Sequence, residues 1–283
     1  VYGQEEIDAV VKCLNESTQM GNYSRKFESA IAELFAKKSC LYVNSGSSAL
    51  YIGIEALGFK EGSEVITPAL TFGTTVGCLV KNNLIPVFVD VEPLTYCIDP
   101  EKIEEMISDK TVAILAPNLM GNICDWKRIR QIADKHNLIV IEDSADTLGG
   151  IINGKLSGTY SDMSITSFYG SHIINCAGNG GMLCTSDKKL ADDARIYRSW
   201  GRSSSLFKNS EDINKRLNYK LDGIRYDAKF IFEKIGYNFE PSEIGASFGL
   251  VQLRKFKKFN SLRNKNFYLH FNFFNKLNKY FIV

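Results

Sequence analysis

The sequence contains 283 residues, of which 45% are hydrophobic and 23% are charged, and its formal net charge is +2. This length suits one large hydrophobic core and the beginning of a second unit. The nearly balanced charge argues against a nucleic-acid partner, because phosphate binding needs an excess of Lys and Arg. No apolar run reaches the ~18 residues that a membrane-spanning helix requires. We therefore expect a cytoplasmic protein that binds neither nucleic acid nor a membrane.

The seven cysteines are odd in number and scattered, and they include no C-x-x-C pair. This spacing predicts neither a disulfide framework nor a zinc site, so we expect a reducing cytoplasm and no bound metal. The opening residues "VYGQEEIDAVVKCL" are acidic and amphipathic, unlike a signal or transit peptide.

Seven short apolar runs rich in β-branched residues alternate with stretches of helical period. Continuous apolar runs are typical of parallel strands buried on both faces, and the helical stretches suit right-handed crossovers between them. We therefore predict an α/β fold with a mostly parallel, seven-stranded sheet covered by helices, over about residues 36–200. The runs cover residues 40–43, 64–67, 85–90, 111–117, 138–143, 162–169 and 181–185.

Two later segments have a different character. Residues 203–232 are polar and irregular, which predicts a surface excursion or an active-site loop. Residues 254–279 carry eight Lys or Arg and no Asp or Glu, interleaved with Phe and Tyr. Such a helix could bind nucleic acid or a membrane surface. We favour a helix whose aromatic stripe joins the core and whose lysines face solvent.

Ligands of an open parallel sheet bind at the carboxyl ends of its strands, so the residues after each run are candidate site residues. "NSGSSAL" follows the first run and offers backbone N–H groups and hydroxyls to an anion at a helix N-terminus. An ordinary helix N-cap explains this segment equally well. Phe72 follows the second run, where it could pack in the core or stack on a flat ligand.

The fifth and sixth runs end in groups that can titrate. Glu142, Asp143 and Asp146 are crowded after "LIVI" of the fifth run, and carboxylates so close to a hydrophobic strand need a positive partner. Ser167 and then His172 come after "DMSIT" of the sixth run. A lone histidine near strand ends is a candidate for proton transfer.

Several motifs in this order resemble the DegT/StrS family of sugar aminotransferases. The resemblance implies an aspartate-aminotransferase-like fold of the pyridoxal-phosphate (PLP) fold type I. It also implies a large cofactor-binding domain with an N-terminal helix at residues 1–240, and the beginning of a truncated small C-terminal domain at residues 241–283. The motifs are "SGSSAL", "TPALTF", "EDSADTLG", "SFYGSH…GNGGMLCT" and "GYNFEPSEIGASFGLVQL".

The same resemblance assigns cofactor contacts. It implies that Gly46, Ser47 and Ser48 hold the cofactor phosphate with help from Ser167, and that Phe72 stacks on the pyridine ring. These roles need an anion cup and a flat apolar surface, which the residue types provide.

Two further residues are assigned in this way. Asp143 is expected to pair with the pyridine nitrogen, because a carboxylate there keeps the ring protonated and able to accept electrons. Asn238, in the "GYN" element, is expected to reach the cofactor phosphate of a neighbouring subunit. The expected assembly is therefore a homodimer with shared sites.

One position departs from the aminotransferase pattern. Members of that family carry a lysine after "SF" that bonds covalently to the cofactor, whereas this chain has His172 there. Histidine cannot form that stable bond, but a neutral imidazole can still move protons. The substitution resembles a branch of the family that uses pyridoxamine phosphate (PMP) to dehydrate nucleotide-linked 4-keto-6-deoxyhexoses at C3. That chemistry implies a role in 3,6-dideoxysugar and surface-polysaccharide biosynthesis.

Within that branch, some members carry an iron–sulfur cluster held by cysteines that follow "WGR". Here "WGR" at 200–202 precedes "SSSLFK", and no cysteine follows before the end of the sequence, so no iron–sulfur cluster is expected. The cluster-free members, which act on a GDP-linked sugar and use glutamate as amino donor, are more similar. The alternative is a non-catalytic relative that lost the lysine and kept a binding or regulatory role.

Overall fold

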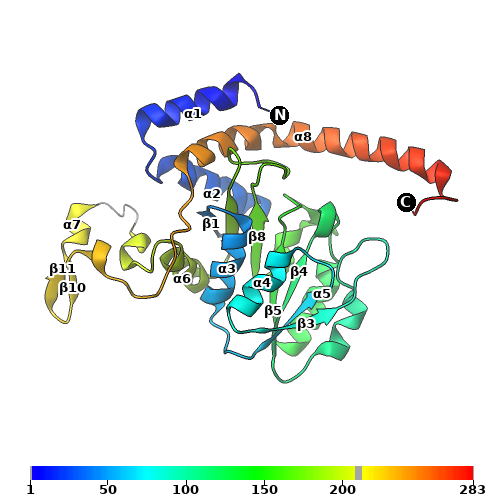
Figure 1. The fold of residues 1–283 in the computed structure, drawn as a ribbon, viewed down its shortest axis with the longest axis horizontal. Coiled ribbons are helices and arrows are strands. Elements are labelled where there is room, and N and C mark those ends of the chain that lie inside the picture. Colours follow the sequence, from blue (N-terminus) through cyan, green and yellow to red (C-terminus); the bar gives the residue numbers. More distant parts are fainter. Residues whose placement is uncertain (1, 208–211, 283) are drawn as a thin grey trace.

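A seven-stranded sheet forms the centre of the protein (Figure 1). The computed structural model describes residues 2–207 and 212–282. All seven predicted strands are present, which confirms the predicted α/β class. Their order across the sheet is β1 (Ser39–Val43), β9 (Gly181–Thr185), β8 (Met163–Ser167), β5 (Ile139–Asp143), β4 (Thr111–Pro117), β2 (Glu64–Pro68) and β3 (Ile85–Val89).

The sheet is mostly parallel, as predicted. β3, β2, β4, β5 and β8 pair in parallel, whereas β9 runs antiparallel to both β8 and β1. All strands except β9 therefore point the same way, and their carboxyl ends share one edge of the sheet. The connections between the parallel strands are long enough to cross over a face of the sheet.

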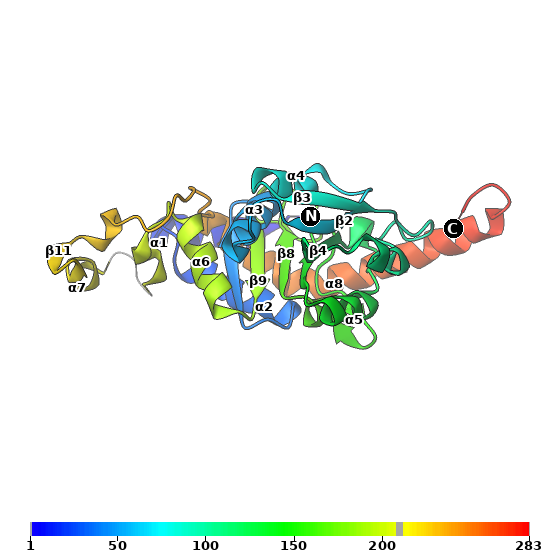
Figure 2. The same ribbon diagram turned by 90° about the horizontal axis from the view of Figure 1, so that it is seen from below.

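Helices cover both faces of the sheet (Figure 2). The side chains of β1 show why: Leu41 and Val43 face one core cluster, whereas Cys40 and Tyr42 face another. The first face is covered by α3 (Gly46–Leu57), α4 (Gly73–Lys81) and α6 (Lys188–Arg198). The second face is covered by α2 (Asn22–Leu34), α5 (Trp126–His136) and the first part of α8 (Glu243–Phe274).

The smaller elements lie outside this core. α1 (Gln4–Glu16) packs on α8, where Lys255 Nζ pairs with the buried Glu6 carboxylate at 2.7 Å. β6 (Ile151–Ile152) and β7 (Lys155–Leu156) form a small hairpin. The predicted excursion contains α7 (Ile213–Arg216), β10 (Tyr219–Leu221) and β11 (Ile224–Tyr226), and it projects from the body beyond α6 (Figure 1).

One disulfide corrects the expectation drawn from the cysteine spacing. Cys40 of β1 and Cys184 of β9 lie directly opposite each other in the antiparallel register and are bonded, although 144 residues separate them. Cys13, Cys78, Cys97, Cys124 and Cys176 are free and buried. Spacing along the chain could not reveal the pair, because the register of two distant strands creates it.

The expectation for the basic C-terminal segment was right about the helix and wrong about the core. Phe256 and Phe259 pack against the core cluster at the start of the segment. Farther along α8, however, Phe267, Tyr268 and Phe273 are 62%, 61% and 57% exposed. The helix extends past the sheet, so its later turns have no core beneath them (Figure 1). None of the helices within residues 2–207 and 212–282 has the length and apolar character needed to cross a membrane.

The start of α8 anchors the N-terminal region. The N-terminus of α2 has no side-chain cap of its own. Instead, the buried Glu243 carboxylate accepts hydrogen bonds from the backbone N–H groups of Gly21 at 2.9 Å, Tyr23 at 2.6 Å and Ser24 at 3.2 Å, and from the Ser24 hydroxyl at 2.5 Å. A carboxylate at this end of a helix satisfies free N–H donors and the helix dipole together.

We expect Glu243→Gln to destabilise the protein, because an amide places donors against these N–H groups and removes the charge. Loss of charge-assisted hydrogen bonds at a buried site should lower the free energy of unfolding by roughly 1.5–3 kcal/mol. Urea unfolding followed by circular dichroism would measure the loss. Glu105→Gln, at an exposed position, is the control. Equal unfolding midpoints for the two variants would contradict this capping role.

Candidate functional site

The predicted site residues gather where the parallel strands end. Turns after β1, β2, β5 and β8 meet at this edge, and the antiparallel β9 begins there. Two contacts link the turns across the sheet: Gly46 lies against Ser167, and the Thr75 hydroxyl donates a hydrogen bond to Asp143. Residues far apart in the sequence therefore surround one region, as the topology of the sheet requires.

The turn after β1 has the form of an anion cup. Ser45 is the N-cap of α3, and its hydroxyl accepts a hydrogen bond from the Ser48 N–H at 3.0 Å. Ser48 is buried, and its hydroxyl lies 2.9 Å from the Ser45 hydroxyl. Ser47 donates to the Thr74 hydroxyl at 3.4 Å. The N-cap interpretation is therefore confirmed. The start of α3 also lies at this edge of the sheet, where binding of an anion stays a prediction.

Glycine is required in this cup by the close approach of two turns. A Cβ on Gly46 would lie 2.8 Å from the Cβ of Ser167, closer than atoms in contact can come. A Cβ on Gly181 would lie 2.2 Å from the backbone carbonyl carbon of Ser45. The predicted phosphate residues Gly46 and Ser167 are therefore in direct contact, which supports their joint assignment.

Phe72 is exposed, so the core-packing alternative is wrong. It is the N-cap residue of α4, and 70% of it is accessible to solvent. Its carbonyl accepts a hydrogen bond from the Thr75 N–H at 3.0 Å. This bond fixes the backbone of Phe72 in the same turn as Thr75, whose hydroxyl contacts Asp143.

Asp143 is a buried carboxylate at the end of β5. It is 5% exposed, and it accepts hydrogen bonds from the Thr75 hydroxyl at 3.0 Å and from the Ala145 N–H at 3.1 Å. Burial raises the pKa of Asp143 to about 6, the charges of Asp146 and Glu142 add to the rise, and the two hydrogen bonds oppose it. Sequence reasoning missed Thr75, whose only signal was its place after the second run.

Glu142 is held by neutral donors, and its nearest cation acts only through its charge. Its side chain is fully buried and accepts hydrogen bonds from hydroxyl and amide groups. The ammonium of Lys37 interacts with Glu142 electrostatically without a direct ion pair between them. The donors and their distances are Ser157 at 2.6 Å, Ser144 at 2.7 Å, Ser164 at 2.8 Å, Asn118 at 3.1 Å and Ser161 at 3.2 Å.

His172 lies in the turn after β8, facing Asp146. Its Nδ1 atom is 3.5 Å from Asp146 Oδ1, and its ring stands edge-on to Tyr169 with 6.1 Å between centroids. Burial lowers the pKa of His172, and the charge of Asp146 opposes that change. The imidazole is therefore mainly neutral at pH 7 and can accept a proton. Sequence reasoning placed Asp146 in the carboxylate group but gave it no role beside His172.

Asn238 is exposed, and its backbone forms an isolated bridge with Ser199 beyond the end of α6. The next residue, Phe239, accepts a hydrogen bond from the Asn44 N–H at 3.1 Å, just before the cup. Within residues 2–207 and 212–282, the Asn238 side chain itself forms no hydrogen bond with a cup residue. A role at a neighbouring subunit stays a prediction.

The region thus combines an anion cup, an exposed aromatic ring, a buried carboxylate and a neutral imidazole. Comparison with known proteins agrees with this combination: residues 2–282 match the DegT/DnrJ/EryC1/StrS aminotransferase family. The chain belongs to this family. The resemblance seen in the motifs is confirmed, as is the fold of PLP fold type I.

Individual DegT/StrS relatives differ in their reactions. The chain is 36% identical over 257 residues to a dTDP-4-dehydro-2,6-dideoxy-D-glucose 3-dehydratase of Saccharopolyspora spinosa, covering 87% of this chain and 55% of that protein. It is 34% identical over 252 residues to a GDP-perosamine synthase of Caulobacter vibrioides, covering 88% and 62%. The family therefore holds both dehydratases and proteins with other names.

A solved DegT/StrS structure matches almost the whole chain. It is the GDP-4-keto-6-deoxy-D-mannose-3-dehydratase of E. coli with bound hydrated PLP. The TM-score is 0.86 at 32% identity, and the match covers 97% of this chain and 71% of that one. The chain spans little more than half the length of the first curated relative.

The raised pKa of Asp143 predicts a pH dependence of stability. The unfolded carboxyl ionises near pH ~4, so this group favours folding fully below that pH, and its contribution is lost as the pH rises through about 6. Between pH 5 and 7, wild type should lose roughly 1 kcal/mol relative to Asp143→Asn. Urea unfolding at both pH values would measure this difference. Asp109→Asn, at an exposed position, should behave as wild type. Parallel pH profiles for wild type and Asp143→Asn would contradict the assigned shift.

Proposed function

We propose that this chain is the cofactor-binding part of a PMP-dependent 3-dehydratase. The substrate class is a nucleotide-linked 4-keto-6-deoxyhexose, and the product is the 3-deoxy sugar. One observation carries the proposal: the position of the family's lysine holds His172, a partly buried imidazole beside Asp146. The names of relatives at 32–36% identity include 3-dehydratases of such sugars, which supports this substrate class.

The residues present suit PMP or PLP. The start of α3 and Ser167 form a cup that a phosphate fits, and Phe72 leaves a ring face free to solvent. Among the described residues no cation pairs with the buried Asp143 carboxylate, and its pKa near 6 reflects the cost of that charge. A protonated pyridine nitrogen is the kind of partner that would stabilise this carboxylate. Gly46, Ser47, Ser48 and Ser167 would hold the phosphate.

The reaction assigns a separate task to each of the chain's groups. When bound, PMP supplies an amine for the 4-keto group and a ring that withdraws electrons. Asp143 would keep the proton on the ring nitrogen. His172, neutral at pH 7, would take up a proton near the reacting carbon, and Asp146 would stabilise the charged imidazole that results. The 3-hydroxyl would then leave as water, and hydrolysis would release the 3-deoxy sugar and ammonia. The two electrons that the sugar gains would come from conversion of PMP to PLP.

Amino transfer by a lysine-bound cofactor is the main competing activity within the family. The chain holds no lysine between Lys155 and Lys188, so the turn after β8 cannot supply one. The retention of Asp143 beside Thr75 argues against a non-catalytic remnant, because a binding protein gains nothing from a costly buried carboxylate. We propose glutamate as the donor that regenerates PMP, and a homodimer as the assembly.

His172→Lys tests the central assignment. Lysine can bond covalently to PLP, so the variant should acquire a yellow cofactor that borohydride fixes to the protein, whereas wild type should not. Formation of the 3-deoxy sugar should fall, because a captured cofactor is not free to act as an amine and because lysine, with a pKa of ~10.4, is a poor base at pH 7.

The assay would incubate each protein with PMP and GDP-4-keto-6-deoxymannose and identify the sugar by mass. His270→Lys, at an exposed position on α8, is the matched control and should keep wild-type behaviour. Undiminished dehydration by His172→Lys would remove His172 from the mechanism. A wild type without dehydration would favour the non-catalytic alternative.

Asn238→Ala tests the shared site. If Asn238 donates to the phosphate of a neighbouring subunit, its loss should weaken cofactor binding by about 1.5–3 kcal/mol without unfolding the protein. Equilibrium dialysis with PLP would measure affinity, and light scattering would measure the assembly. Asn264→Ala, on the exposed part of α8, is the control. A monomer with unchanged cofactor affinity would exclude the shared site.

A further inference from the structure

His172 lies at the centre of a short loop that one backbone hydrogen bond closes at its base. We call residues 168–176, between β8 and β9, the His172 loop. The Cys176 N–H donates to the Phe168 carbonyl at 3.1 Å, and the His172 N–H donates to the Tyr169 carbonyl at 3.0 Å. Phe168 and Cys176 are buried, whereas Tyr169 is 57% exposed. The position of the imidazole therefore depends on how the buried ends of the loop are held.

α8 approaches the His172 loop through two glycines that lie one helical turn apart. A Cβ on Gly245 would lie 3.0 Å from the Cys176 carbonyl oxygen, and a Cβ on Gly249 would lie 2.7 Å from the Cys176 Sγ atom. On its other side, the Gly249 Cβ would lie 3.0 Å from the Phe27 ring. Cys176 is only 3% exposed, so its sulfur has little space into which to move. Glycine at position 249 is therefore what allows Cys176 its place.

A further contact joins α8 to the residue next to the imidazole. The Arg263 Nη2 atom donates to the Ile173 carbonyl at 2.8 Å, and Ile173 directly follows His172. The Ile173 side chain packs against the same core cluster as Phe259 of α8. α8 thus contacts the loop at Cys176 and again beside His172, where the loop reaches the helix (Figure 1).

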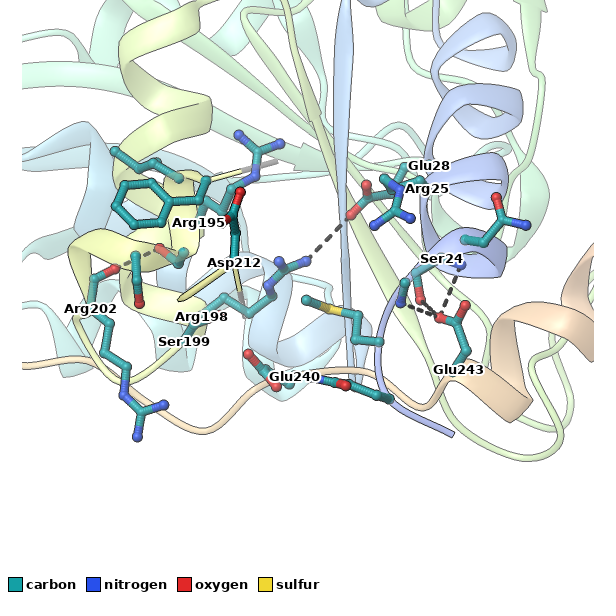
Figure 3. A pocket seen from close by; sticks show the side chains of 18 of the residues that line it. Ser24, Arg25, Glu28, Arg195, Arg198, Ser199, Arg202, Asp212, Glu240 and Glu243 are labelled. Carbon is teal, nitrogen blue, oxygen red and sulfur yellow. Dashed lines mark hydrogen bonds and ion pairs between the residues drawn. The ribbon is translucent and has the colours of Figure 1, made fainter. Parts of the chain in front are cut away.

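The remainder of the fold fixes α8 in place. The first turn of α8 is bonded to α2, because the Ser24 hydroxyl donates to the Glu243 carboxylate at 2.5 Å (Figure 3). The middle of α8 is bonded to α1, because Gln252 and Lys255 each donate to the buried Glu6 carboxylate at 2.7 Å. A helix held at several points is a rigid support for a loop that carries a functional side chain.

We propose that α8 positions His172, with Gly249 and Arg263 as positioning residues. Gly249 leaves the space in which Cys176 closes the loop, and Arg263 holds the carbonyl beside the imidazole. Together they set the contact in which the imidazole Nδ1 atom lies 3.5 Å from Asp146 Oδ1. A base acts only within hydrogen-bond reach of its proton, so a small displacement of the loop should slow proton transfer. The inference rests on the proposed role of His172 as the base.

Gly249→Ala tests the contact with Cys176. Alanine is the better helix former, so the variant favours α8 while its Cβ displaces the Cys176 end of the loop. An NMR titration of the full chain would follow the His172 imidazole, whose signal is the one missing from His172→Lys. We expect the titration midpoint to move to lower pH, because displacement weakens the effect of the Asp146 charge. We also expect kcat for dehydration to fall about tenfold at unchanged KM.

A double variant decides whether this effect passes through Cys176. Cys176→Ala removes the sulfur that the new Cβ would meet and keeps the N–H that closes the loop. Adding Gly249→Ala to Cys176→Ala should therefore leave the titration and kcat close to those of Cys176→Ala alone. A loss that persists in the double variant would overturn the role of Cys176. A Gly249→Ala variant with the titration and kcat of wild type would overturn the proposal.

Arg263→Gln tests the other contact at an exposed position, and it remains informative if Gly249→Ala does not fold. It should speed amide hydrogen exchange in the His172 loop and lower kcat at unchanged KM, and Arg263→Lys should recover part of both losses. Arg254→Gln, at another exposed position on α8, should behave as wild type. Unchanged exchange and kcat in Arg263→Gln would exclude this contact. If wild type forms no 3-deoxy sugar, the proposed function fails, but the His172 titration and the exchange rates still test the positioning.

Discussion

The burial of one carboxylate determines much of what this edge of the sheet can do. Asp143 ends a strand that is covered on both faces, and the sheet leaves it only a threonine hydroxyl and a backbone N–H as donors. Two donors do not replace the water that a carboxylate loses, and the pKa near 6 records the remaining cost. A cationic ring nitrogen would remove that cost. If the cofactor binds as we propose, the start of α3 would hold its phosphate. Phe72, whose carbonyl accepts a hydrogen bond from the Thr75 N–H, would then lie near its ring.

The protein environment shifts the pKa values of Asp143 and His172 in opposite directions. Burial raises the pKa of Asp143 and lowers the pKa of His172, so each is shifted toward its neutral form. A cation at Asp143 would restore its charge, whereas Asp146 prepares His172 to accept a proton. Environments that push pKa values in opposite directions allow one site to hold a proton at one atom and to move a proton at another. A lysine in place of His172 would be charged at pH 7 and would serve neither task without strong desolvation.

Sequence reasoning succeeded where local pattern decides the structure. The apolar runs located every strand of the main sheet, and the rule for strand ends placed Asp143, Ser167 and His172 at one edge. It failed where the register of distant segments decides. The Cys40–Cys184 disulfide and the cap that Glu243 provides for α2 join residues more than 100 positions apart, and no local signal marks them. The aromatic stripe of α8 has the pattern of a core helix. The helix extends beyond the sheet, however, so its later aromatic side chains are exposed.

Strand β1, which leads into the cofactor cup, is an edge strand of the sheet. β1 pairs with β9 along one edge only. The backbone groups along its other edge have no strand to pair with. At Tyr42 the Glu28 carboxylate accepts a hydrogen bond from the backbone N–H, and Arg198 donates one to the backbone carbonyl. This ion pair therefore satisfies backbone groups that a neighbouring strand would otherwise pair. Three residues later, Ser45 caps the helix of the cup. Arg198 therefore uses one side of its guanidinium to hold the strand that leads into the cup.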